Sequence, residues 1–153
     1  MVVLLAAFNS FDTISKSQAY QADRTQSIDD MRGALQRMTK ELRQATAVTQ
    51  PSSVPSSTLT YVTYVDGVST TIVYSASGTT LTRKVGSAAA FTVLTHLAST
   101  NVSTPSSATD VTGIQWVEID LQVTPARSPN TTLALEAKVN LRNRTAALEG
   151  TTT

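Results

Sequence analysis

The chain has 153 residues and a formal net charge of +1, which fits one domain with a single core. A charge so close to zero creates no field that would recruit nucleic acid or repel a membrane, so we predict no nucleic-acid partner. Because cysteine is absent, disulfides, thiolate metal sites and thiol nucleophiles are excluded. Serine and threonine supply 43 residues and charged residues only 15% of the chain, a balance that favours a secreted or surface-exposed β protein.

The first 48 residues contain no proline and one glycine, Gly33, and predict a single long helix. At about 1.5 Å per residue, a helix over residues 2–48 would be roughly 70 Å long. The remaining hundred or so residues would form a body only about 26–30 Å across. Part of the helix must therefore protrude, and a protruding helix needs a partner. Pro51 and Pro55 then prevent the helix from continuing.

This helix has three regions. Residues 1–8 are an unbroken apolar run, much shorter than the 20 or so residues that span a bilayer, and they lack the basic start of a signal peptide. They are either the first turns of a soluble core helix or the end of a membrane helix, and the missing N-cap residue favours the second. Residues 9–27 form a polar neck, and between residues 12 and 27 Ile14 is nearly alone as an apolar side chain. From residue 28, an apolar stripe predicts packing against the chain's own core: Ile28, Met31, Leu35, Met38, Leu42 and Ala45.

The rest of the chain predicts short strands. Two β-prone runs, 58–65 and 68–74, are joined by Asp66-Gly67, the strongest short signal for a hairpin. A third strand covers 79–85, and residues 88–102 fit a short strand or one helical turn equally well. Residues 113–123 and 133–141 alternate apolar and polar side chains and predict two half-buried strands that pair, with Glu118 or Asp120 opposite Lys138 or Arg142.

These elements predict an α+β fold in which the second half of a long N-terminal helix packs on one antiparallel sheet of five or six strands. We assign residues 1–27 to the protruding helix, 28–144 to the globular domain and 145–153 to a disordered tail. Nothing in the chain predicts an enzyme, a metal site or a cofactor. His96 is the only histidine, and it has no strained serine turn beside it in the sequence.

Three sequence runs resemble the type IV pilin family, in particular the J-type minor pseudopilins of type II secretion and their pilus counterparts. Residues 31–45, MRGALQRMTKELRQA, look like the second half of the pilin helix. Tyr74 in IVYS and Arg83 in LTR look like a strand pair of that subfamily, and VNLRNR at 139–144 looks like its closing strand. The resemblance covers most of residues 20–144 and implies a type IV pilin-like fold.

The resemblance also implies a function. A minor pilin or pseudopilin would prime or cap a type IV pilus or a type II secretion pseudopilus. Its partners would be other minor subunits, the major pilin and the inner membrane, and it would act extracytoplasmically after leaving that membrane. By this match the apolar segment begins roughly 12–18 residues upstream of Met1. The residues expected to drive assembly are Val3, Leu4, Phe8, Phe11 and Ile14. The alternative is a surface-exposed binding module, such as an adhesin or a DNA-uptake component, that uses the Ser/Thr-rich loops.

Overall fold

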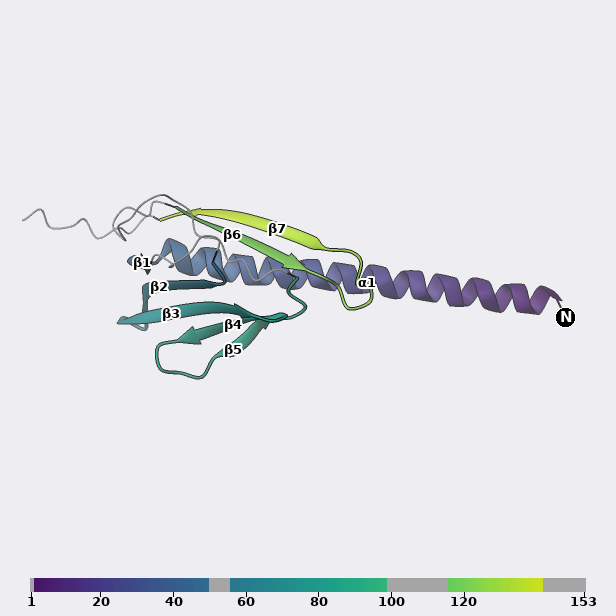
Figure 1. Cartoon of the computed structure of the whole chain (residues 1–153), viewed down its shortest axis with the longest axis horizontal. Helices are drawn as coiled ribbons and strands as arrows, with labels where there is room; N and C mark the ends of the chain where they lie inside the picture. The colour runs from purple at the N-terminus through teal and green to yellow at the C-terminus, as the bar shows by residue number, and fades with distance from the viewer. Residues whose placement is uncertain (1, 50–55, 99–115, 142–153) are drawn as a thin grey trace, which may run out of the picture.

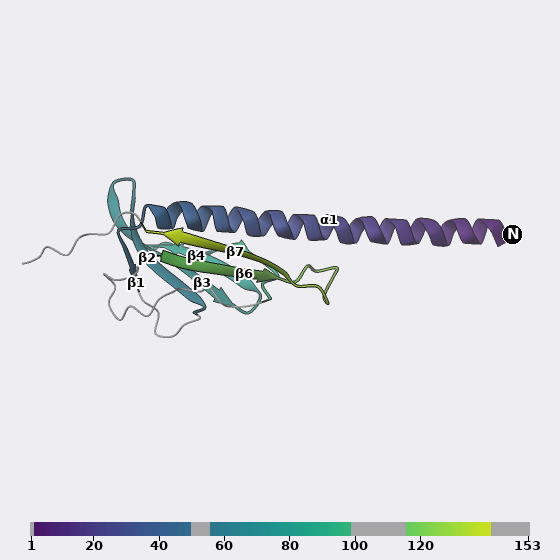
Figure 2. The same cartoon turned by 90° about the horizontal axis from the view of Figure 1, so that it is seen from above.

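A computed structural model describes residues 2–49, 56–98 and 116–141, with side chains from residue 14 onward within these ranges. Its dominant element is α1, Val2–Arg43, a single helix of 42 residues. At about 1.5 Å per residue it is roughly 63 Å long. Figures 1 and 2 show that all the strands lie along its C-terminal half, while its N-terminal half extends beyond them. The expected protrusion of the helix is therefore present.

The helix ends earlier than the sequence predicted, at Arg43 instead of Val48. The N–H groups of Gln44 and Ala45 donate to the carbonyls three residues back, and the tightened turn ends the helix. The Thr46 N–H then donates to the Val62 carbonyl at 2.8 Å, and β1, Ala47–Thr49, pairs antiparallel with β2, Thr58–Val65. Its β-branched residues favour a strand once the edge of a sheet is within reach, and this tertiary pairing overrides the absence of a helix breaker.

The main sheet contains β2, Thr58–Val65; β3, Val68–Ser77; β4, Thr80–Val85; and β5, Phe91–Leu94, all antiparallel in the order β1-β2-β3-β4-β5. The Asp66-Gly67 hairpin is confirmed. Both residues have positive φ, 50° and 79°, the combination that a two-residue type I′ turn requires. The ambiguous segment 88–102 resolves as a strand over its described part, at Phe91–Leu94.

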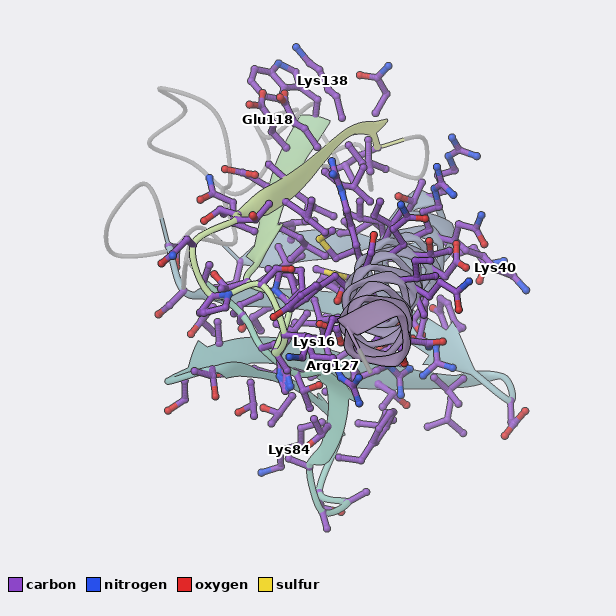
Figure 3. The ribbon with its side chains drawn as sticks, turned by 90° about the vertical axis from the view of Figure 1, so that its right-hand side faces the viewer. Lys16, Lys40, Lys84, Glu118, Arg127 and Lys138 are labelled. Atoms are coloured by element: carbon purple, nitrogen blue, oxygen red, sulfur yellow. The ribbon has the colours of Figure 1, made fainter. Side chains whose placement is uncertain are left out.

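The last two strands do pair, but they form a sheet of their own, so the prediction of one continuous sheet was wrong. They are β6, Trp116–Val123, and β7, Leu133–Asn140. After β5 the chain turns at His96, whose φ is 58°, and within the described residues the bridge between Leu97 and Val123 joins the two sheets. The β6–β7 hairpin lies beside α1 and covers a side of the helix that the main sheet does not reach (Figure 3).

The core lies where α1, the main sheet and the hairpin meet. The predicted stripe of α1 is confirmed there, because Met31, Met38 and Leu42 have no exposed surface. The inward residues of β6 are buried as the alternation predicted: Val117, Ile119, Leu121 and Val123. Each large apolar side chain buried in this way contributes about 1.5–3 kcal/mol. The coarse α+β class is therefore as expected, with the helix held from two sides.

Candidate functional site

The N-terminal half of α1 is the first candidate site, because it extends beyond the strands (Figure 1). Of the residues predicted to drive assembly, Val3, Leu4, Phe8 and Phe11 lie on the helical backbone, and their side chains lie outside the described set. The Ile14 side chain is described and is 55% exposed. Between residues 14 and 22 every side chain except that of Ala19 is classed as exposed, so this part of the helix receives little cover from its own domain.

The polar neck satisfies its hydrogen-bonding groups largely within the helix. Thr25 and Ser27 donate their hydroxyls to carbonyls four residues back, at 2.9 Å each, and Gln26 donates to the Asp30 carboxylate at 2.8 Å. The loop between β6 and β7 contacts the neck at Asp23, whose carboxylate accepts the backbone N–H of Arg127 at 2.8 Å. The loop between β6 and β7 therefore contacts the helix at the point where the neck enters the body.

A cluster of four polar side chains joins the packed half of α1 to the main sheet. The Glu41 carboxylate accepts hydrogen bonds from the hydroxyls of Tyr61 and Tyr74, the latter at 3.0 Å. Arg83 donates to the same carboxylate through Nη2 at 2.8 Å and through Nε at 3.2 Å. One helix residue thus bonds side chains on β2, β3 and β4. This geometry fixes both the rotation of α1 and its position along the sheet.

The cluster is largely withdrawn from water. The side chains of Arg83 and Glu41 are 14% and 18% exposed, and the Tyr61 and Tyr74 rings stack with centroids 6.3 Å apart. Burial, followed by the contact with Glu41, raises the pKa of both tyrosines above the ordinary value. Burial alone would lower the pKa of Arg83, but its hydrogen bonds and charge attraction to Glu41 more than offset this and raise it.

The arrangement performs a structural role. All four hydrogen bonds to the Glu41 carboxylate come from side chains of the main sheet. Removing one partner of a buried ion pair leaves the other uncompensated, at a typical cost of about 3–5 kcal/mol, so the contacts are mutually dependent. The cluster therefore sets the direction in which the first half of α1 leaves the body.

Sequence reasoning missed this cluster. Tyr74 and Arg83 entered only through the resemblance, and Glu41 was not singled out. The available signal was its spacing, since Glu41 follows Met38 by three residues and therefore lies next to the buried side of the helix. A charge at such a position requires a buried partner of opposite charge. In the sequence, the candidates for that partner were the basic residues of the strands.

The parts of the chain that the structure describes contain no group of three or more histidine or carboxylate side chains that could hold a metal ion. The single histidine of the chain, His96, is exposed. None of the helices in these parts has an apolar stretch long enough to cross a bilayer. A groove of about 510 Å³ runs between α1 and β7, lined by Leu35, Gln36, Thr39, Lys40, Arg43, Gln44 and Ala137.

Comparison with models of known protein families, with curated proteins and with solved structures finds no match to this chain. Its function must therefore be argued from the residues and geometry described above.

Proposed function

We propose that this protein is a structural subunit of a filament, a minor pilin or pseudopilin that primes or caps a type IV pilus or a type II secretion pseudopilus. One observation carries the proposal: a single helix of 42 residues lies along the body with its second half and extends beyond the body with its first half. Such a rod presents an extended surface to other chains. The resemblance of residues 20–144 to pilins supports the same reading.

The exposed apolar groups on this rod favour association with other helices. The side chains of Ile14 and Tyr20 are 55% and 48% exposed, and the sequence places the apolar run 1–8 upstream of them. Burial of apolar surface is favourable by about 25 cal/mol for each Å². Bundling several such helices buries the surface that a single copy leaves exposed, and this stabilises the assembly. The partners we propose are other minor subunits, the major pilin and the inner membrane.

The polar cluster gives the proposed subunit a defined shape. Because Glu41 bonds residues of three strands, the body cannot rotate around α1 without breaking those contacts. In a filament built on bundled helices, each body would then face its neighbours at a fixed angle. We propose no catalytic activity for the chain, and no cofactor.

The experiment that tests this function mixes the full chain with sibling minor subunits and measures complex formation by size-exclusion chromatography with light scattering. We expect a stable complex that Ile14→Asp weakens, because a carboxylate replaces an apolar contact at the helix surface. Tyr64→Ser is the matched control, since Tyr64 is 63% exposed but lies on the β2–β3 hairpin. Failure to bind every sibling, or equal effects of both variants, would argue against the proposal.

A surface-exposed binding module is the second candidate, and one observation favours it. Tyr64 and Val68 are 63% and 65% exposed at the tip of the β2–β3 hairpin, where an aromatic and an aliphatic side chain flank the turn. Stacking on an exposed aromatic ring is a common way to bind sugars or bases. Binding of a glycan or of DNA by the full chain, lost in Tyr64→Ser and kept in Ile14→Asp, would favour this function over assembly.

A further inference from the structure

The packed half of α1 carries a basic face on its outer side. Arg37, Lys40 and Arg43 recur every three residues and are all exposed. Neither Lys40 nor Arg43 forms an ion pair with any residue that the structure describes, and Arg37 contacts only the ring of Phe91, at 6.0 Å. Lys40 and Arg43 also line the groove of about 510 Å³ between α1 and β7. Three cations with no counter-charge among the described residues therefore lie on this face, and two of them border the groove.

The outer face of the β6–β7 hairpin carries the opposite charge. Asp120 lies directly across from Glu136, so two carboxylates face each other where opposite charges would be favourable. Glu118 lies across from Lys138 as the sequence predicted, but the Lys138 ammonium sits 3.6 Å from the centroid of the Trp116 ring. Charge repulsion from Glu118, with a smaller contribution from Asp120, raises the pKa of Glu136. Cations from outside the hairpin would reduce the repulsion between the carboxylates of this acidic face.

The basic face and the acidic face match in size. Successive cations on α1 are about 4.5 Å apart along the axis, so the basic face extends roughly 9 Å. On the hairpin, Glu118 and Asp120 are separated by about 7 Å along the strand, and Glu136 lies about 5 Å across. Figure 3 shows Lys40 on one side of α1 and Glu118 at the outer end of the hairpin, pointing in different directions. The two faces therefore cannot neutralise each other within one copy.

We propose that the basic face of α1 in one copy docks against the acidic face of the β6–β7 hairpin in a second copy. The inference rests on the proposed filament function, in which it fits the priming role and not the capping role, and it identifies a neighbour of the subunit: another copy of the same chain. The contact is heterologous, because two different surfaces meet, so each copy keeps one free face for the next. Since the faces point in different directions around α1, successive copies are rotated as well as shifted, which generates a helical array.

Exposed charge pairs are individually weak, so this contact acts together with helix bundling. Each pair at an exposed surface contributes about 0.2–1 kcal/mol and is screened by salt. Once α1 of one copy is bundled with its neighbour, the faces meet at a high effective concentration, and a weak contact is enough to select the neighbour's orientation. The docking therefore determines register, while helix burial supplies most of the affinity.

The test measures self-association of the full chain by sedimentation velocity at about 20 mM and about 500 mM salt, where the screening lengths are about 20 Å and 4 Å. We expect Lys40→Glu with Arg43→Glu to weaken association about tenfold at low salt and little at high salt. Asp120→Lys with Glu136→Lys should do the same. The matched control, Lys84→Glu with Arg127→Glu, makes the same change in net charge at exposed positions away from both faces and should leave association unchanged.

Mixing the two face variants gives the sharpest readout. The first variant carries carboxylates on both faces and the second carries cations on both faces, so each face of one variant meets the opposite charge on the other. An equimolar mixture should therefore regain the association that each variant alone has lost. No complex in the mixture, or equal weakening by the control pair, would overturn the inference. If the parent chain associates equally at both salt concentrations and the face variants associate as well as the parent, the docking proposal is wrong, while assembly driven by helix bundling is still supported. If only binding to a sibling subunit is lost, the occupant is that sibling and not a second copy.

Discussion

Replacing Glu41 by alanine is the most informative perturbation of this fold, because one carboxylate holds three partners. The variant leaves the Arg83 cation without its counter-charge and leaves the hydroxyls of Tyr61 and Tyr74 without their acceptor. A broken buried ion pair costs about 3–5 kcal/mol, and each buried unsatisfied hydroxyl about 1–3 kcal/mol. These costs overlap, because a single carboxylate serves all three partners and water can partly solvate the ion-pair side chains, which are 14% and 18% exposed. We therefore expect a total loss of at least about 3 kcal/mol.

The measurement is equilibrium unfolding in urea, followed by the helical circular dichroism signal and by the fluorescence of Trp116, the only tryptophan. A loss of about 3 kcal/mol is a large fraction of the 5–15 kcal/mol typical of a domain. Gln44→Ala is the matched control, since Gln44 is exposed and lies three residues further along, and it should change stability by less than about 0.5 kcal/mol. The two signals should shift together if the cluster couples helix and sheets.

A double-mutant cycle with Arg83→Ala makes the reasoning refutable. If Glu41 and Arg83 act as one unit, the double variant should be more stable than the sum of the single losses implies, with a coupling of at least about 1 kcal/mol. Additive losses would show that the ion pair does not bind the helix to the sheet, and the argument for a fixed projection direction would fail with it.

Three further outcomes are expected. The free energy of unfolding should be fully retained below pH ~10 and fall as pH rises above it, because unfolding lets Tyr61 and Tyr74 ionise at their ordinary pKa; a double Phe variant should flatten the fall in a pH series of urea melts. Gly67→Val should cost about 1–3 kcal/mol, since φ there is +79°, and a calorimetric melting temperature equal to that of the parent chain would contradict the turn geometry. Met38→Ala should cost about 2–5 kcal/mol in the same urea assay, and a loss below 1 kcal/mol would mean the core is not closed around α1.

Local patterns in the sequence predicted most of the elements. The β2 strand and its Asp-Gly turn appear where composition placed them, because a positive φ at two successive positions admits few residue types. The stripe through Met31, Met38 and Leu42 is buried because helical periodicity brings these residues to one face. Alternation likewise predicted which residues of β6 are buried.

What the sequence did not predict depends on contacts between distant residues. The end of α1 at Arg43 is decided by the bond from Thr46 to Val62, sixteen positions away, and not by a local breaker. The separation of the β6–β7 hairpin from the main sheet had no local signal in the sequence either, and the positive φ of His96 after β5 was not predicted, although histidine adopts this conformation more often than most residues. The Glu41 cluster assembles side chains from four elements, so no single window of sequence contained it. The assembly role of residues 3–14 stays a prediction.

The strands of the β6–β7 hairpin lie nearly parallel to the axis of α1 (Figures 1 and 2). Traction along the protruding rod would therefore slide the helix past the strands instead of lifting it away from one end. Sliding must disrupt the interlocked side chains of α1, both sheets and the Glu41 cluster simultaneously, whereas lifting would open them one after another. A body packed on its helix in this orientation would resist unfolding when mechanical load is applied along the helix axis.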